Sequence, residues 1–278
     1  MSGVLPIAAN ISTLFRELPL LERFEAARSQ GFDGVEIQFP YAQPPEALAR
    51  AAAAASMPVV LINAPVIPAE HPFGIAGRPE LKTLFRAQLA QAAEYAEALD
   101  ARFVHVLAGL LPDEAQRERY LGVYEDNLRL AADVLHAKGI GVLIEPLNLS
   151  DVPDYLVGSF DLARTIVARS QPGIGLQFDA YHAARMGLDL VNELERALPY
   201  VGHVQFADAP GRHEPGTGGV PFRDMLGTLR DAQYAGWLGA EYFPSGTTDR
   251  SVGWLADWRA AMSTSDNLSR LPPDRRSG

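Results

Sequence analysis

Four oxygen-bearing side chains lie at or near the ends of four successive apolar runs in the second half of the chain. These four strand-end residues are Glu145, Asp179, Gln205 and Glu241. Short runs rich in Val, Leu, Ile and Phe predict buried strands of a parallel sheet. Three carboxylates and one amide offer only oxygen ligands, which suit a hard divalent cation such as Mg²⁺ or Mn²⁺. We therefore predict a divalent metal site built from these residues.

Pairing with Arg or Lys inside the protein is the alternative explanation for acids on buried strands. An ionised carboxylate in an apolar interior is costly unless it is paired or bound to a metal. For a single acid neither explanation would be preferred. Here four oxygen-bearing residues occur in succession and their strands carry no Lys. This combination favours a metal site.

Two further side chains follow the predicted strand ends. His182 comes three residues after Asp179, where its imidazole would either bind a substrate oxygen or cap the next helix. Arg212 lies in the polar loop after the strand of Gln205. A guanidinium matches a carboxylate with two hydrogen bonds, so we expect Arg212 to bind an anionic substrate group. A surface Arg without such a role is the alternative.

Two polar residues within predicted strands receive structural interpretations. Glu36 is expected to form hydrogen bonds inside the protein and support the site, and His105 is expected to be a core histidine whose hydrogen bonds are satisfied. The other histidines are weaker candidates, and the tryptophans are expected in the core or at an interface. The histidines are His71, His136, His203 and His213, and the tryptophans are Trp237, Trp254 and Trp258.

The whole chain alternates strand-like and helix-like segments. Strands are expected at 4–9, 34–39, 59–62, 103–107, 141–145, 175–179, 202–206 and 237–242. Helices are expected at 20–29, 45–55, 79–99, 113–137, 160–169, 188–197, 222–231 and 248–262. Such alternation predicts an α/β protein with a parallel sheet, and this number of units predicts a (β/α)₈ TIM barrel.

An open doubly wound sheet is the alternative architecture. It usually carries a glycine-rich turn after its first strand, whereas this chain reads Ala9-Asn10-Ile11-Ser12 there. We therefore predict one barrel domain over residues 1–262. The polar, Pro-containing tail at 263–278 is expected to be disordered.

Composition excludes several functional classes. The chain has 278 residues, a net charge of −10 and no Cys. The acidic balance argues against nucleic acid as a partner, and the lack of Cys excludes disulfides and thiolate metal sites. No secretory signal and no apolar run long enough for a membrane span are visible, so we expect a cytoplasmic protein. Serine-hydrolase and nucleotide-binding glycine motifs are absent.

Several motifs around these residues resemble the hydroxypyruvate isomerase family, within the xylose-isomerase-like TIM barrels. The resemblance runs from about Ala8 to Trp258. Its most specific stretches are Gly31-Phe32-Asp33-Gly34-Val35-Glu36, Ile144-Glu145-Pro146-Leu147-Asn148, Gln177-Phe178-Asp179-Ala180-Tyr181-His182, His203-Val204-Gln205-Phe206-Ala207-Asp208 and Arg212-His213-Glu214-Pro215-Gly216. Together these stretches identify the chain as a member of that family.

The resemblance implies a role for each candidate residue. The four strand-end residues would bind Mg²⁺ or Mn²⁺, and Glu145 and Glu241 would also be the catalytic acid and base. The substrate-binding residues would be His182, Arg212 and Arg78. The implied reaction interconverts hydroxypyruvate and tartronate semialdehyde through an enediolate. The implied assembly is a homo-oligomer that acts on a small hydroxy-oxo acid or sugar.

Two positions depart from the family pattern. Before Asn63 this chain has Ile62, whereas hydroxypyruvate isomerases have His before that Asn, and Phe243 stands where many relatives have Lys. A lost lysine would weaken the binding of an anionic group or leave that role to Arg212 and Arg78. A 2-oxo-tetronate isomerase and a ketose 3-epimerase therefore stay as alternatives on the same metal site. Non-catalytic binding of a sugar acid is a further alternative. A zinc nuclease is disfavoured by the acidic charge and by only six His.

Overall fold

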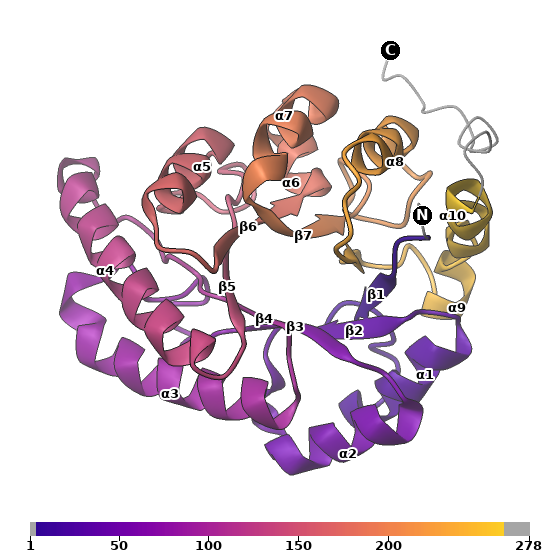
Figure 1. Cartoon of the computed structure of the whole chain (residues 1–278), viewed down its shortest axis with the longest axis horizontal. Coiled ribbons are helices and arrows are strands. Elements are labelled where there is room, and N and C mark those ends of the chain that lie inside the picture. The colour runs from indigo at the N-terminus through magenta and orange to yellow at the C-terminus, as the bar shows by residue number, and fades with distance from the viewer. Residues whose placement is uncertain (1–3, 264–278) are drawn as a thin grey trace.

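Eight parallel strands close into a barrel with each strand paired to its neighbours in chain order (Figure 1). The structure is a computed structural model that describes residues 4–263. The strands are β1 (Ile7–Asn10), β2 (Gly34–Ile37), β3 (Val59–Asn63), β4 (Phe103–His105), β5 (Gly141–Ile144), β6 (Ile174–Asp179), β7 (Val201–Phe206) and β8 (Leu238–Ala240). The predicted TIM barrel is confirmed. Apart from Ser263, the predicted disordered tail lies outside the described residues.

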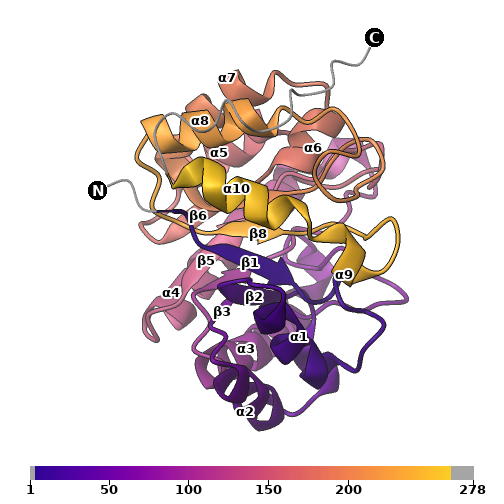
Figure 2. The same ribbon diagram turned by 90° about the vertical axis from the view of Figure 1, so that its right-hand side faces the viewer.

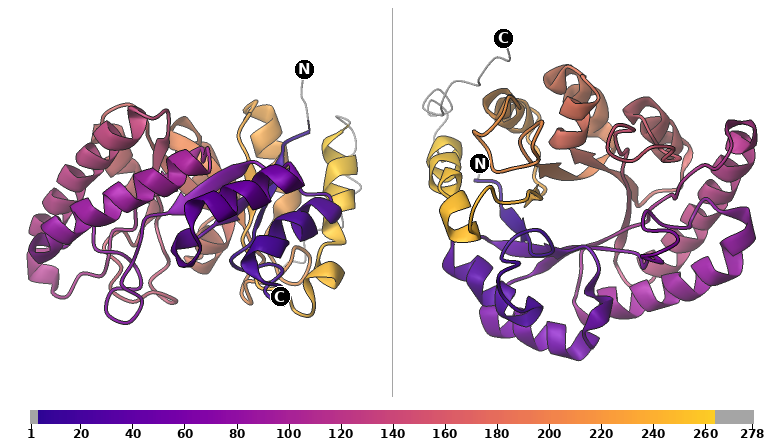
Figure 3. Two further views of the ribbon diagram at one scale, coloured as in Figure 1. Left: turned by 90° about the horizontal axis from the view of Figure 1, so that it is seen from below. Right: turned by 180° about the vertical axis from the view of Figure 1, so that it is seen from behind.

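Helices surround the barrel on its outer side, as the views from below and behind show (Figure 3). They are α1 (Arg23–Ser29), α2 (Pro45–Ala55), α3 (Lys82–Ala98), α4 (Arg117–His136), α5 (Phe160–Arg169), α6 (Ala180–Arg185), α7 (Leu190–Ala197), α8 (Phe222–Asp231), α9 (Thr248–Ser251) and α10 (Trp254–Met262). Short 3₁₀ helices lie at Leu20–Glu22, Pro40–Ala42, Pro79–Leu81, Glu114–Gln116 and Leu198–Tyr200. No helix within residues 4–263 is long and apolar enough to cross a membrane.

Sequence patterns account for these elements. Every residue of β3 is buried, as expected for a strand that packs against side chains on both faces. In α7, Leu190, Leu194 and Ala197 are buried at helical spacing, and the side chain of Asp189 caps the first turn. The barrel closes between β1 and β8, and α10 lies along this junction (Figure 2). Trp254 and Trp258 are buried in the core.

Two helices differ from the predictions. The expected helix at 188–197 begins at Leu190, and an additional helix, α6, precedes it. This happens because Asp179 ends β6 and also caps α6, since its Oδ1 accepts a hydrogen bond from the Tyr181 backbone N–H at 2.9 Å. The expected helix at 248–262 is interrupted after Ser251 and divides into α9 and α10.

Candidate active site

The four strand-end residues lie at the carboxyl end of the barrel, on four neighbouring strands. Asp179 is the last residue of β6, Gln205 lies one residue before the end of β7, and Glu145 and Glu241 directly follow β5 and β8. The strand register pairs Asp179 with Gln205. Each of the four is at most 6% exposed. Carboxyl strand ends are where TIM barrels carry their active sites, so this is the candidate site.

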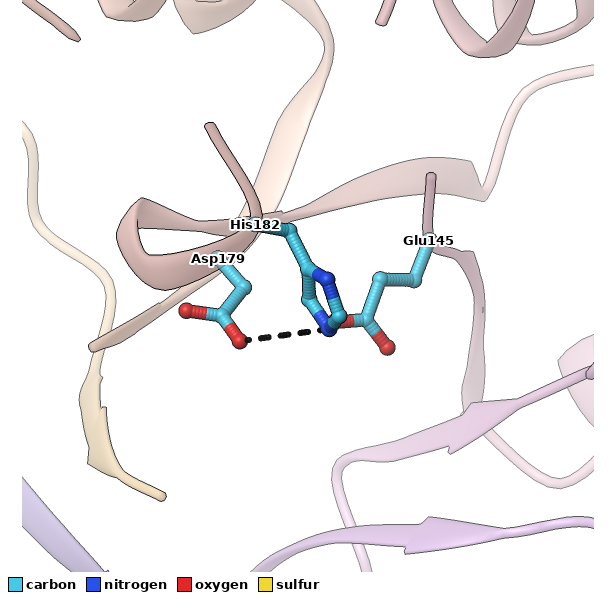
Figure 4. Close-up of side chains that lie close together, drawn as sticks. All are labelled: Glu145, Asp179 and His182. Carbon is cyan, nitrogen blue, oxygen red and sulfur yellow. Dashed lines mark ion pairs between the residues drawn. The ribbon is translucent and has the colours of Figure 1, made fainter. Parts of the chain in front are cut away.

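Glu145, Asp179 and His182 form the centre of the site (Figure 4). Each offers a ligand atom, and these atoms lie within 4.8 Å of one another. The Nε2 atom of His182 lies 3.8 Å from Oε1 of Glu145 and 3.8 Å from Oδ2 of Asp179. All three side chains are buried. The short helix α6 brings His182 to the two acids.

Arg212 extends over the same group of acids. Its Nη2 atom lies 3.0 Å from Oε1 of Glu241 and 3.5 Å from Oδ2 of Asp179. The guanidinium stacks on the ring of Tyr181, with 4.8 Å from its central carbon to the ring centroid. Arg212 is thus a site residue by position and links Glu241 to Asp179.

The loop that carries Arg212 is held by one buried carboxylate. The side chain of Asp208 accepts four backbone hydrogen bonds of 2.8–3.0 Å, from Ala209, Gly216, Gly218 and Val220. Arg212 itself has a φ of 56°, in the left-handed region that non-glycine residues rarely adopt. Its carbonyl accepts a hydrogen bond from the Phe243 backbone N–H at 2.8 Å. These contacts hold the guanidinium over the acids.

A layer of polar side chains beneath the site orients two of the predicted ligands. Gln177 donates from Nε2 to Oε2 of Glu145 at 2.9 Å and to Oε1 of Gln205 at 2.6 Å. Gln205 donates from Nε2 to Oε2 of Glu36 at 2.7 Å. The other Glu36 oxygen pairs with Nε2 of His203 at 2.5 Å. Glu36 therefore has the supporting position that we expected, and it sets the orientation of the Gln205 amide.

Sequence reasoning missed two residues of the site. Gln177 lies two residues before Asp179, so strand alternation puts it on the same face of β6, and this signal was present in the sequence. Gln38 follows β2 and donates from Nε2 to Oε1 of Glu241 at 2.7 Å. Because Gln38 lies outside the strand and far from Glu241 in the chain, no local pattern indicated it.

Gly239 on β8 leaves the space that the Glu36 carboxylate occupies. A Cβ atom on Gly239 would lie 1.9 Å from Oε1 of Glu36. We expect Gly239→Ala to displace Glu36, release the Gln205 amide and cost about 1–3 kcal/mol of stability by overpacking. Thermal denaturation measures this loss. Gly122→Ala on α4 is the matched control, because a Cβ there meets nothing within 4 Å. A Gly239→Ala protein as stable as the control would contradict this account.

Burial raises the pKa of all three acids of the site. Burial, followed by the neighbouring Glu241 and Asp179, raises the pKa of Glu145 well above its usual value. Burial raises the pKa of Glu241 to about 7 and that of Asp179 to about 6, although Arg212 opposes both shifts. Without a bound cation, the site therefore retains protons near neutral pH.

The donor set fits a divalent cation. Oε1 of Glu145 and Oδ2 of Asp179 are buried and accept no hydrogen bond from residues 4–263. Buried carboxylate oxygens without hydrogen bonds are costly, and a cation would satisfy them beyond the ion pair that Oδ2 of Asp179 forms with Arg212. The amide oxygen of Gln205 and the carboxylate of Glu241 would complete a set of oxygen ligands of the kind that Mg²⁺ and Mn²⁺ prefer.

The raised pKa values predict how the stability of the metal-free protein depends on pH. Between about pH 4 and pH 7 the folded protein binds more protons at Asp179 and Glu241 than the unfolded chain does. Stability in EDTA should therefore fall as the pH rises through this window, by several degrees in Tm. Mg²⁺ should stabilise the protein more at pH 8 than at pH 5. Equal stabilisation at both pH values would count against a carboxylate metal site.

Other predicted residues lie outside these contacts. Arg78 is held by Glu80, with Nε and Nη2 at 2.8 and 2.7 Å from its Oε1 atom. His105 is buried and lies 3.6 Å from Glu145, and burial lowers its pKa to about 3. It is the expected core histidine, but neither of its ring nitrogens has the expected hydrogen-bond partner within residues 4–263. Asn63 ends β3 and is buried, whereas Phe243 is 40% exposed. A role for Arg78 in substrate binding stays a prediction.

Comparison with known proteins assigns the family. Residues 24–258 match the xylose isomerase-like TIM barrel family. The chain belongs to this family. It is 39% identical to the putative hydroxypyruvate isomerase of Homo sapiens, over 91% of this chain and 95% of the relative. It is 36% identical to the 2-oxo-tetronate isomerase of Cupriavidus necator, over 89% of this chain and 96% of the relative.

Further relatives agree with this assignment. The chain is 35% identical to the hydroxypyruvate isomerase of Escherichia coli strain K12, over 92% of this chain and 100% of the relative. Among solved structures, one described as AP endonuclease, family 2, from Brucella melitensis matches with a TM-score of 0.86 and 36% identity, over 92% of this chain and 99% of that one. The resemblance to hydroxypyruvate isomerases is confirmed, and the protein is an enzyme of the isomerase class.

Proposed function

We propose that this isomerase interconverts hydroxypyruvate and tartronate semialdehyde (2-hydroxy-3-oxopropanoate) through an enediolate, in a reaction that depends on Mg²⁺ or Mn²⁺. The observation that carries the proposal is the pair of buried glutamates, Glu145 and Glu241, beside Asp179 and Gln205. Both glutamates have a raised pKa, and Arg212 lies 3.0 Å from Glu241. The names of the relatives support the same substrate class.

The four strand-end residues would hold the cation. When bound, it would act as a Lewis acid that stabilises negative charge developing on the substrate oxygens. Gln177 and Glu36 support this arrangement because they fix the oxygens of Glu145 and the amide of Gln205.

The two glutamates would move the proton between the carbons. One carboxylate removes a proton from C3 of hydroxypyruvate, and the substrate becomes an enediolate. A carboxyl group then delivers a proton to C2, and the proton of the C3 hydroxyl passes to the C2 oxygen, so that the C2 oxygen becomes a hydroxyl and the C3 oxygen becomes the aldehyde. A carboxylate and its conjugate acid can accept a proton and return it, and the burial that raises the pKa of Glu241 in the metal-free protein favours this role.

Arg212 would bind the substrate carboxylate. It is the guanidinium in contact with Asp179 and Glu241, so an anionic group held beside these acids is within its reach. Its planar donors suit a carboxylate. This supports an oxo acid over a neutral ketose as the substrate.

A four-carbon oxo acid is the second candidate substrate. A cavity of about 390 Å³ lies beside the loop after Glu241 and is lined by Thr13, Arg16 and Phe243. The exposed Phe243, which lines this cavity, stands where the family pattern often has Lys. Three relatives with 31–36% identity are described as 2-oxo-tetronate isomerases.

A comparison of substrates tests the proposed function. The kcat/KM should be highest for hydroxypyruvate, lower for 2-oxo-tetronate and negligible for neutral ketoses such as D-fructose. A preference for the four-carbon acid would transfer the assignment to 2-oxo-tetronate isomerase on the same site. A preference for a ketose would contradict the role of Arg212 and the oxo-acid proposal.

Removal of the metal should abolish turnover. We expect dialysis against EDTA to reduce the rate to background, because the charge that develops on the substrate then lacks its cation. Adding Mg²⁺ or Mn²⁺ should restore it. Full activity in EDTA, in protein shown by elemental analysis to be metal-free, would contradict metal dependence.

A further inference from the structure

The Nδ1 atom of His182 receives hydrogen bonds from Asn148, a buried residue in the loop after β5. The backbone N–H of Asn148 donates to Nδ1 at 3.1 Å. The side-chain Nδ2 of Asn148 lies 2.8 Å from the same atom. Both residues are 1% exposed, so water does not replace these contacts. The backbone amide can only donate, which makes Nδ1 an acceptor.

Asp151 fixes which way the Asn148 amide points. Oδ1 of Asn148 accepts a hydrogen bond from the Asp151 backbone N–H at 2.9 Å. Nδ2 of Asn148 donates to Oδ2 of Asp151 at 3.0 Å. The NH₂ group therefore faces both the Asp151 carboxylate and the imidazole, and each of its hydrogens has one acceptor. Asp151 is itself held by the Tyr181 hydroxyl at 2.6 Å and by Arg185 at 3.1 Å.

The two donors on Nδ1 determine the tautomer of the ring. An imidazole with an unprotonated Nδ1 carries its proton on Nε2. Nε2 of His182 is buried, lies 3.8 Å from both Glu145 and Asp179, and has no hydrogen-bond partner within residues 4–263. Its N–H bond is thus available to a group bound between the two acids. A protonated Nε2 has no lone pair to give to a cation.

We propose that Asn148, oriented by Asp151, is a positioning residue that sets His182 as the Nε2–H tautomer, so that His182 donates a hydrogen bond to a substrate oxygen and does not ligate the metal. The inference rests on the proposed function for the identity of that oxygen, which is the one on C2 of the oxo acid. Negative charge grows there as the enediolate forms, and a buried donor aimed at such an oxygen stabilises the transition state. His182 then lies close to Glu145 and Asp179 because all three residues surround the same bound substrate.

The tautomer is measurable in the wild-type protein without any turnover. Protein labelled with ¹⁵N-histidine and loaded with Mg²⁺ gives separate NMR signals for protonated and unprotonated ring nitrogens. The signals of His182 are identified by their loss in His182→Gln. We expect Nδ1 of His182 to be unprotonated and Nε2 to carry the proton. A proton on Nδ1, or coordination of Nε2 to the metal, would overturn the inference.

Asn148→Asp tests the positioning role. The substitution keeps the shape but replaces one of the two donors to Nδ1 with an acceptor, while the backbone N–H still donates there, so the preference for the Nε2–H tautomer should weaken. We expect kcat to fall about 10²-fold, as for loss of one oxyanion donor, with little change in KM or in the Mg²⁺ affinity measured by calorimetry. Asn192→Asp on α7 is the matched control, because it adds the same charge at an exposed position.

The outcomes separate this inference from the proposed function. Wild-type kcat in a folded Asn148→Asp protein would overturn the positioning role. If Asn148→Asp does not fold, the NMR measurement of the His182 tautomer in the wild-type protein still tests the inference. If hydroxypyruvate is not turned over by the wild type, the proposed function fails, while the NMR signals of His182 continue to report its tautomer.

Discussion

Replacing Glu241 or Glu145 with Gln is expected to lower kcat on hydroxypyruvate by about 10²–10⁴-fold, the usual contribution of a general acid or base. Gln keeps the side-chain shape and one oxygen for a cation, but it cannot carry the transferred proton. Steady-state kinetics at saturating Mg²⁺ measure the loss, and calorimetry shows whether the cation still binds. The larger loss identifies the residue that removes the C3 proton.

Glu195→Gln is the matched control for both variants. Glu195 lies on α7 and is exposed, so the same chemical change there should leave turnover unaltered. If Glu145→Gln or Glu241→Gln retains near wild-type turnover with the metal bound, that glutamate is not the proton carrier.

Arg212→Met is expected to reduce kcat/KM for hydroxypyruvate by about 10²-fold or more, because charged hydrogen bonds contribute about 1.5–3 kcal/mol each and this guanidinium can form two. Met preserves the packing on Tyr181 while removing the charge. Most of the loss should appear as a higher KM, since the substrate carboxylate is not the reacting group.

Arg78→Met serves as the comparison for Arg212. Within residues 4–263 Arg78 forms its ion pair with Glu80 and not with an acid of the site, whereas Arg212 contacts Asp179 and Glu241, so substitution of Arg78 should have a smaller effect. A larger effect of Arg78→Met than of Arg212→Met would reverse the two roles. Both variants should remain folded by circular dichroism, since neither side chain belongs to the apolar core.

The site residues at the strand ends were predictable because they lie next to apolar runs in the sequence. Buried parallel strands require continuous Val, Leu and Ile, and an acid directly after such a run must lie at the carboxyl end of the barrel. Glu145 and Glu241 are the clearest cases, because each follows its strand by a single residue. The helix after Asp179 was not predicted, because α6 begins at the cap that Asp179 provides and apolar periodicity did not indicate it.

The supporting contacts depend on tertiary structure. Glu36 on β2 reaches Gln205 on β7 because Gly239 leaves space on β8, so this contact depends on residues from three different strands. The position of Arg212 depends on the four hydrogen bonds that Asp208 accepts within its loop. The link from Asp151 through Asn148 to His182 joins the loop after β5 to helix α6. Local sequence patterns carry no information on these distances, so the roles of Gln38 and Asn148 emerged only from the structure.

Exchange of the C3 protons of hydroxypyruvate with solvent tests the central claim most directly. Proton NMR in D₂O, with enzyme and Mg²⁺, should show loss of the C3 signal together with the appearance of tartronate semialdehyde, and EDTA should stop both. Formation of an enediolate requires this exchange or the direct return of the same proton to C2, and the product signal detects either route. A Mg²⁺-bound protein that neither exchanges the protons nor forms the product would contradict the account.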